Sequence, residues 1–276
     1  MMDLGALTVG STFFLGKYQV ESETPWDIEW EIVHQTDNYQ IARVTKIIDI
    51  RAFDGKEINN PNSDRASDGN NNWQYSNIKQ FLNSDQASWY SAHHTYDAPP
   101  TSANCWQYSN GTTYNAYDTH KGFLYYWSAD EKALLRDMTL TLANNSVTDG
   151  GGSYTWTGKV WLPTLTQMGG GQNNSISEGE QFSKFITQDG RKITIHEKVI
   201  ENNEYAKLEN YTTNSNIYYW LSSAYTSYSD YASFAYTPGY SIGGGPMYAS
   251  IRGLAPCICL SKSGSFGVPS DLNYVD

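Results

Sequence analysis

The sequence predicts a single α+β domain over residues 1–276, with a twisted antiparallel sheet, short helices and long loops. Two patterns lead to this fold class. First, several segments of strand length either alternate apolar with polar residues or are rich in β-branched residues. Second, serines in helix-capping patterns are followed by short runs in which apolar residues recur at helical spacing. Because no composition break, repeat or heptad period is present, we expect no second domain. Residues 261–276 are expected to form a C-terminal tail.

The N-terminal part of the chain is expected to supply the first strands. Residues 13–15, Phe-Phe-Leu, begin the first strand. Between Ile28 and Ile32, apolar residues alternate with glutamates, which is typical of a strand with one buried face. The β-branched segment 41–50 is interpreted as its partner. Residues 59–72 are polar and are interpreted as a solvated loop.

Short helices and turns are predicted along the middle of the chain. Ser76 is expected to cap a helix with one apolar face, formed by Ile78, Phe81 and Leu82. Residues 128–131 match a capping box, and the apolar positions that follow it share one helical face: Ala133, Leu134, Leu135 and Met138.

Further along, residues 149–152, Asp-Gly-Gly-Gly, predict a turn. Residues 157–162 read as a strand that Pro163 ends, followed by a short helix at 165–168. Residues 177–180 match a second capping box, which would open a helix at 182–186.

Two apolar, strand-like segments bracket a long polar stretch near the C-terminus. The first begins Tyr-Tyr-Trp-Leu-Ser-Ser-Ala at residue 218, and the last is Gly-Leu-Ala-Pro-Cys-Ile-Cys-Leu at 253–260. Strands buried in a sheet could display the tyrosine-rich middle as loops; alternatively, the segment is an ordinary β-meander with tyrosines at strand edges. The residues predicted to lie in the core are Trp73, Phe81, Leu82, Trp220 and Ile258.

These segments resemble a known family. Trp220, Leu221 and Ser223 match its motif W-W-L-R-[ST]-P, and Gly253 and Pro256 match its closing motif G-V-R-P-A-L. Residues 72–83, together with the preceding Asn71, match N-x-W/Y-x-x-S-x-[IL]-x-x-[WFY]-L-N, and residues 51–54 and 89–100 are also similar. The chain departs from the family at Ser222 and Ala255, where arginines are usual, and at Ala224, where proline is usual.

The family that the chain resembles is an uncharacterised C-type-lectin-like domain of structural proteins of Gram-positive bacteriophages. It is distantly similar to the variable proteins of diversity-generating retroelements and to the formylglycine-generating-enzyme fold. The resemblance implies that the N-terminal strands and the closing strand, residues 256–260, share one sheet. It also implies a virion location on the capsid, tail or baseplate, other virion structural proteins as partners, and ligand contacts from the late segment of the fold.

Composition and charge exclude several classes of function. Only 17% of residues are charged while 14% are aromatic, including 22 Tyr and 9 Trp, so the surface suits sugar or protein recognition. The net charge of −11 argues against nucleic acid as a partner. The N-terminus carries no signal-peptide pattern, and no stretch is apolar and long enough to span a membrane, so we expect synthesis in the host cytoplasm and no membrane insertion. A homo-oligomer is expected.

The sequence offers little support for a metal site, a cofactor or an enzymatic activity. An EF-hand loop aligned on Gly69 would place alanine and tyrosine at ligand positions, although Asp64 and Asp68 lie nearby. His93 and His94 are adjacent and would point apart. Cys257 and Cys259 share one strand face and are interpreted as small buried hydrophobes rather than a metal or redox pair. We therefore expect no metal, no cofactor and no enzymatic activity.

Three functions follow, in decreasing order of support. The first is a virion surface protein that binds a host-surface glycan or receptor. The second is a capsid or tail decoration protein with a purely structural role, and the third is an enzyme related to formylglycine-generating enzymes. The ligand residues expected under the first function are Tyr225, Tyr228, Tyr231, Tyr240, Tyr248 and Arg252, and the strongest expectation falls on Tyr225, Tyr228 and Tyr240 beside turn-forming residues. Alternatively, residues 231–236 alternate so that Ala232, Phe234 and Tyr236 are buried.

Overall fold

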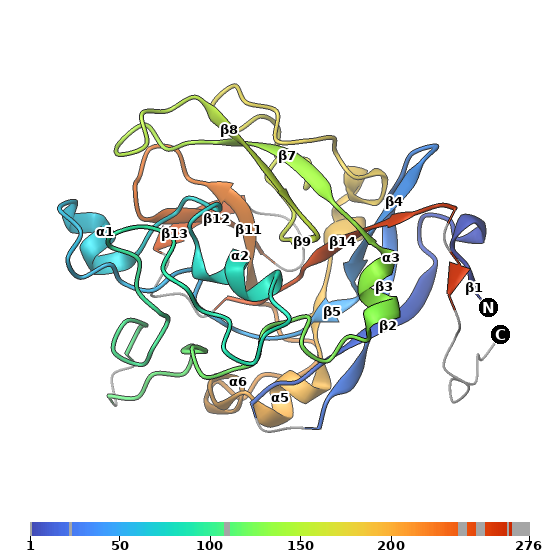
Figure 1. The fold of residues 1–276 in the computed structure, drawn as a ribbon, viewed down its shortest axis with the longest axis horizontal. Helices are drawn as coiled ribbons and strands as arrows, with labels where there is room; N and C mark the ends of the chain where they lie inside the picture. Colours follow the sequence, from blue (N-terminus) through green and yellow to red (C-terminus); the bar gives the residue numbers. More distant parts are fainter. Residues whose placement is uncertain are drawn as a thin grey trace.

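The computed structural model describes residues 2–21, 24–107, 111–236, 242–246, 252–263 and 265–266. The fold is mixed α+β, built mostly of strands with a few short helices (Figure 1). Its largest sheet is antiparallel, in the order β2-β3-β4-β14-β6, and β9 also pairs with β14. These strands are β2 (Thr12–Tyr18), β3 (Trp26–Gln35), β4 (Tyr39–Val44), β6 (Leu135–Arg136), β9 (Val160–Trp161) and β14 (Cys257–Ser261).

The large sheet brings the two ends of the sequence together, as expected. Ile258 pairs with Ala42 and Cys259 with Ile41, so the closing strand lies beside the N-terminal strands. The register of β2 on β3 shifts between Phe14 and Lys17. Gly16 lies in that interval with φ 69°, and a Cβ there would lie 2.1 Å from the Trp127 ring, so the close ring contact requires glycine.

Smaller sheets and helices surround the large sheet. The three-stranded sheet contains β11 (Tyr218–Ala224), β12 (Tyr231–Tyr236) and β13 (Ile242–Pro246). Three further sheets have two strands each: β7 (Met138–Ala143) with β8 (Ser153–Gly158), β1 (Met2–Asp3) with β15 (Ser265–Phe266), and β5 (Lys46–Ile47) with β10 (Thr194–Ile195). The helices are η1 (Leu4–Ala6), α1 (Ser63–Asp68), α2 (Asn77–Leu82), α3 (Ala129–Leu134), η2 (Ser183–Ile186), α4 (Gln188–Arg191), α5 (Glu197–Asn202) and α6 (Glu204–Leu208). Among the described residues, no helix has the length and apolar character needed to cross a bilayer.

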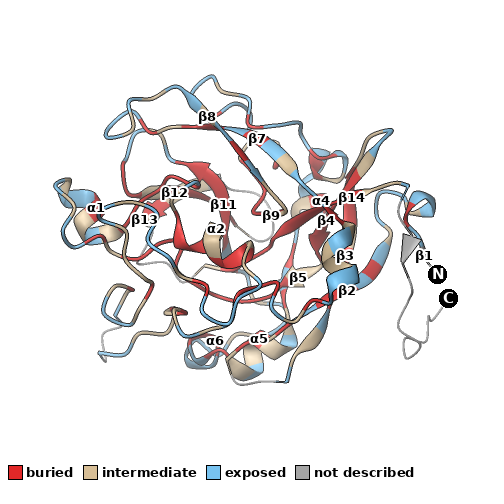
Figure 2. Cartoon of the chain, viewed as in Figure 1, coloured by how far each residue is buried: buried red, intermediate tan, exposed pale blue. Residues whose placement is uncertain are grey.

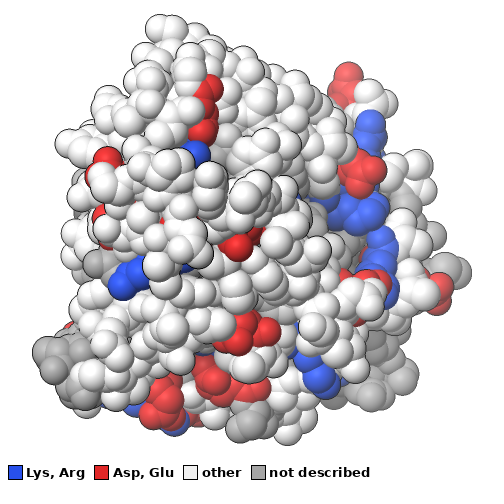
Figure 3. Space-filling view, turned by 60° about the vertical axis from the view of Figure 1, so that its left-hand side comes forward, with Lys and Arg blue, Asp and Glu red and all other residues white. Residues whose placement is uncertain are grey.

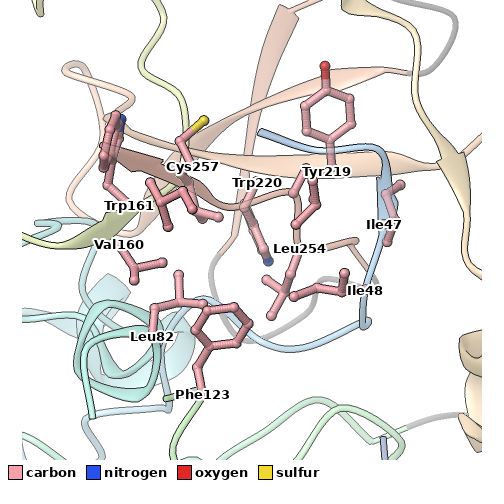
Figure 4. Close-up of a cluster of buried hydrophobic side chains, with 14 of the residues drawn as sticks. Ile47, Ile48, Leu82, Phe123, Val160, Trp161, Tyr219, Trp220, Leu254 and Cys257 are labelled. Atoms are coloured by element: carbon pink, nitrogen blue, oxygen red, sulfur yellow. The ribbon is translucent and has the colours of Figure 1, made fainter. Parts of the chain in front are cut away.

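The core lies between the sheets and α2 (Figures 2 and 4). Trp73, Phe81, Leu82, Trp220 and Ile258 are each at most 1% exposed, which confirms the predicted core residues. Ser76 caps α2 by accepting a hydrogen bond from Lys79 N, and the buried face of α2 is the predicted one. Figure 4 shows Leu82 and Phe123 beside Val160 and across from Trp220 and Leu254, so α2 closes one side of this apolar cluster.

Several expectations about local structure are wrong. Both hydrogen bonds of the capping box at Ser128 are present, but α3 ends at Leu134 and buries none of its residues. Leu135 and Arg136 form β6 instead, because they pair with Leu260 and Cys259 of β14. Residues 59–72 are also not a solvated loop: they include α1, and Asn71 is fully buried.

The segment between β8 and η2 differs from expectation as well. The strand predicted over 157–162 is split at Lys159, where Asn83 Oδ1 accepts hydrogen bonds from Lys159 N and Val160 N. Residues 165–168 form turns rather than a helix. The second capping box is absent because the Ser177 hydroxyl donates to the Gly179 carbonyl instead, and η2 begins at Ser183 without a side-chain cap.

Candidate functional site

Three of the predicted tyrosines stack on one another at the surface. Tyr225 and Tyr228 lie in the loop between β11 and β12, and Tyr231 begins β12. The ring centroids of Tyr225 and Tyr228 are 5.7 Å apart, and those of Tyr228 and Tyr231 are 4.6 Å apart with nearly parallel planes. Tyr225 is 40% exposed and Tyr228 47%. We call this row of three rings the tyrosine ladder; it offers a continuous aromatic surface with phenol groups at its edges.

A hollow of about 350 Å³ adjoins the ladder. The described residues that line it are all neutral: Leu165, Gly170, Asn173, Tyr225, Thr226, Ser227, Ser233 and Gly243. Ser233 is only 3% exposed, yet its hydroxyl makes no hydrogen bond to a residue within the described ranges. A buried hydroxyl that opens into a hollow is satisfied only by a guest or by water. We call this feature the neutral hollow.

Glycines of β13 allow side chains to lie directly against this strand. A Cβ at Gly244 would lie 2.5 Å from the Tyr225 ring, and one at Gly243 would lie 2.9 Å from the Phe234 ring. Any side chain at Gly244 would therefore displace Tyr225, the residue shared by the ladder and the neutral hollow. The glycine-rich sequence of this segment thus has a packing function at the site.

The backbone of the ladder loop is held by side chains from the region of α1. Asn71 Nδ2 donates to the Tyr228 carbonyl at 2.7 Å and to the Tyr231 carbonyl at 3.0 Å. Arg65 Nε donates to the Ser229 carbonyl at 3.2 Å. Within the loop, Tyr225 N donates to the Tyr231 carbonyl at 2.8 Å. Because these groups are largely buried, the ladder is ordered before any ligand arrives.

A second set of polar side chains holds Asn71 and Arg65 in place. Asp149 accepts hydrogen bonds from Arg65 Nη2 at both carboxylate oxygens, at 2.8 and 2.9 Å. Asn145 Nδ2 donates to Asn71 Oδ1 and to Asp149, each at 2.9 Å. The predicted turn at Gly150–Gly152 follows Asp149, and all three glycines have φ between 69° and 77°. Ser146 N also donates to the Thr226 carbonyl at 2.9 Å, so this segment supports the hollow as well.

Glu178 is bonded to Asn173 in the wall of the neutral hollow, and no sequence pattern marked it as a functional carboxylate. It accepts hydrogen bonds from Asn173 Nδ2 and Ala143 N, each at 3.0 Å, and from the Ser223 hydroxyl. Burial raises the pKa of Glu178, while these hydrogen bonds oppose the rise. Because Asn173 lines the hollow, Glu178 positions one of its polar walls.

The remaining predicted site residues lie elsewhere. Tyr240 and Tyr248 fall outside the described residues. The Arg252 guanidinium packs on the Trp220 and Phe234 rings, with 4.5 and 4.0 Å to their centroids, and burial lowers its pKa to about 10. It therefore lies within the packing of the β11-β12-β13 sheet rather than on the ladder.

The alternating pattern considered for residues 231–236 is not observed. Ala232, Ser233 and Ala235 are buried, whereas Phe234 and Tyr236 are half-buried. The two rings pack against Tyr218 on the neighbouring strand β11, with centroids 4.8 and 4.6 Å from its ring. The small residues of β12 are buried, and its rings remain partly accessible.

Metal and redox chemistry find no matching site in the described part of the chain. None of the described residues form a group of three or more His, Cys, Asp or Glu side chains arranged to hold a metal. The cysteines Cys105, Cys257 and Cys259 are free and buried. Burial raises the pKa of all three thiols, that of Cys259 to about 11, which disfavours the reactive thiolate.

A cluster of ionisable side chains surrounds Arg51, which is 1% exposed. Its guanidinium lies 2.8 Å from both Asp49 and Glu21, and His120 Nε2 lies 3.2 Å from the second oxygen of Glu21. Burial alone would raise the pKa of Glu21, but the hydrogen bond from His120 and the Arg51 charge lower it to about 2. The Arg51 guanidinium is thus shared between two carboxylates, which is typical of a structural network.

The face that carries α1 and β13 is poor in charge. Figure 3 brings this side of the molecule forward, and its charged side chains are scattered over a surface that is mostly neither acidic nor basic. Among the residues coloured in this view, Lys and Arg side chains are interspersed with Asp and Glu rather than gathered in one broad patch.

Comparison with known proteins gives one match. A family model matches residues 37–262, and the family is described as a domain of unknown function (DUF6273). No curated protein and no solved structure matches the chain. The matched range begins just before β4 and extends past β14, so it includes the neutral hollow, the ladder and its support.

Proposed function

Because the chain belongs to the DUF6273 family, whose description assigns no activity, we propose a function from the site itself: the protein binds a host-surface glycan as part of a bacteriophage virion. The resemblance of residues 72–83, 218–224 and 253–260 to virion proteins supports the virion location and a C-type-lectin-like fold. The family match neither adds to this part of the proposal nor opposes it.

The observation that carries glycan binding is the tyrosine ladder beside the neutral hollow. A pyranose ring has flat faces of C–H groups that stack on an aromatic surface, and its hydroxyls need neutral donors and acceptors around the rim. Tyr225 and Tyr228 provide the surface, while Asn173, Ser227 and Ser233 provide polar groups next to it. Since none of the described residues that line the hollow is charged, a neutral sugar fits it better than a phosphate or a carboxylate.

Preorganisation favours the same conclusion. Exposed side chains on a loosely held loop lose conformational entropy on binding, which weakens the complex. The ladder loop is fixed by Asn71 and Arg65, and tyrosine itself has few rotatable bonds. Stacking can therefore contribute to affinity with little opposing cost.

The test is a double substitution, Tyr225→Ala with Tyr228→Ala. Both side chains are more than a third exposed, so the fold is expected to remain. Loss of two stacking rings, each worth about 0.5–1.5 kcal/mol, predicts roughly 5- to 150-fold weaker binding to purified host cell-wall glycan and weaker adsorption to cells. The matched control is Tyr125→Ala, which removes a 38% exposed tyrosine elsewhere and should leave binding unchanged. Equal binding by the double variant and the parent, at equal melting temperature, would favour the decoration role instead.

A further inference from the structure

A second hollow, of about 430 Å³, lies against α1 and shares residues with the support of the ladder. Asn62 and Arg65 line it, and both also bond to Ser229 in the ladder loop: Asn62 Oδ1 accepts from the Ser229 hydroxyl at 3.0 Å, and Arg65 Nε donates to its carbonyl. The remaining lining includes the Asn70 amide and an aromatic wall. We call this feature the amide hollow.

The charged side chains at the amide hollow have bonding partners within the protein. Arg65 is paired with both oxygens of Asp149. Glu57, which is fully buried, has one oxygen 2.9 Å from His94 Nε2 and the other bonded to Asn60 Nδ2. Arg65 is thus neutralised by Asp149, and the Glu57 carboxylate is held by His94 and Asn60, so a neutral guest is favoured over an ion.

In two asparagine side chains of the hollow, the amide oxygen already accepts a hydrogen bond, whereas the NH2 group is available as a donor. Asn70 is 2% exposed, and its Oδ1 accepts from Asn72 N at 3.0 Å. Asn62 Oδ1 accepts from Arg65 N at 2.9 Å, which caps α1. Because both oxygens face backbone N–H groups, neither amide can be rotated by 180° without placing donor against donor. Neither Nδ2 group donates to another residue in the described part of the chain.

An apolar surface stands beside these donors. The Tyr75 and His94 rings meet edge to face with centroids 5.4 Å apart, and Tyr96 is 38% exposed. His94 is held in turn, since Tyr96 N donates to its Nδ1 at 3.3 Å. The hollow thus combines spare N–H donors with aromatic walls.

We infer that the amide hollow is a second subsite, which takes the acetamido group of an N-acetylated amino sugar; this rests on the glycan-binding function proposed above. The acetamido carbonyl offers a neutral acceptor to the Asn62 and Asn70 amides, and its methyl group lies against the aromatic wall. A plain hydroxyl at the same position would supply an acceptor but no apolar group to fill the wall. The subsite therefore selects for N-acetylation, while the tyrosine ladder accepts any pyranose.

The experiment compares chitotriose with cellotriose, which differ in their acetamido and hydroxyl groups, by isothermal titration calorimetry. Chitotriose should bind at least tenfold more tightly. The variant Asn62→Asp retains the oxygen that caps α1 and accepts from the Ser229 hydroxyl, but it replaces the Nδ2 donor with an acceptor, so it should weaken chitotriose binding about tenfold and leave cellotriose binding unchanged. Asn214→Asp, the same change at an exposed position, is the matched control and should have no effect. Tyr96→Ala should weaken chitotriose selectively.

Failure of this inference is distinguishable from failure of the proposed function. Equal affinity for the two trisaccharides, or chitotriose binding unaffected by both Asn62→Asp and Tyr96→Ala, would overturn the acetamido subsite. Binding of neither trisaccharide would overturn it too. In each of these cases, weaker binding of cell-wall glycan by the Tyr225 and Tyr228 double variant would still support the ladder as the ligand face.

Discussion

Replacing Asn71 by alanine tests whether a buried amide outside the ladder holds it in place. The side chain is fully buried and makes three hydrogen bonds, two donated to the loop carbonyls and one accepted from Asn145. The Tyr231 carbonyl keeps its bond from Tyr225 N, and Asn145 keeps its bond to Asp149, but the Tyr228 carbonyl loses its 2.7 Å donor. One unsatisfied buried carbonyl and two weakened partners predict a loss of about 2–4 kcal/mol in the free energy of unfolding.

The measurement is chemical denaturation at equilibrium, together with titration of the glycan. Because Tyr228 is no longer held against Tyr231, we also expect binding to weaken about tenfold at temperatures where the variant is folded. Asn38→Ala is the control, since Asn38 is exposed and only its backbone groups are bonded. A loss below about 0.5 kcal/mol with unchanged glycan affinity would refute the idea that Asn71 orders the ladder.

Three further predictions concern the core, a buried carboxyl and the thiols. Trp220→Ala should lower the free energy of unfolding by about 3–5 kcal/mol in denaturant titrations, because a fully buried ring that donates to the Arg51 carbonyl is lost; an unchanged midpoint would contradict its place in the core. Burial and a hydrogen bond with Asp68 raise the pKa of Asp230 from 3.8 to about 7, so the folded state holds this proton more tightly and its contribution to stability falls as pH rises from about 4 to 7. Asp230→Asn should therefore raise the melting temperature relative to the parent at pH 8 but not at pH 4, and equal shifts at both would argue against this titration. All three cysteines are buried, so a thiol reagent should modify none in the native protein and three in denaturant; rapid native labelling would show that one is accessible.

Local patterns predicted those elements whose causes are local. The alternation at Ile28–Ile32 and the cap at Ser76 depend on near neighbours in sequence, and both are confirmed in β3 and α2. The end of α3 depends instead on pairing of Leu135 with Leu260, a partner far away in sequence, which propensity cannot reveal. A helical period that extends through Met138 was therefore misleading.

In the candidate site too, some residues could be predicted from local sequence and others could not. Composition pointed to Tyr225, Tyr228 and Tyr231, and the structure brings these three together. It did not point to Asn71 or Asp149, because an asparagine in a polar stretch looks solvated until the topology encloses it. Support for a ligand surface comes from segments distant in sequence, so it becomes visible only when the chain is folded.

The position of β14 also constrains when the chain can fold during its synthesis. This strand lies between β4 and the pair β6 and β9, so the largest sheet cannot close until Cys257–Ser261 has left the ribosome. About 200 residues are translated between Arg43 and its partner Cys257, which takes roughly 10–40 s at about 5–20 residues per second. For that time the outer edge of β4 exposes unpaired N–H and C=O groups to other nascent chains. Dense translation of one messenger would therefore favour wrong pairing between copies, and slower or chaperone-assisted synthesis should raise the yield of folded protein.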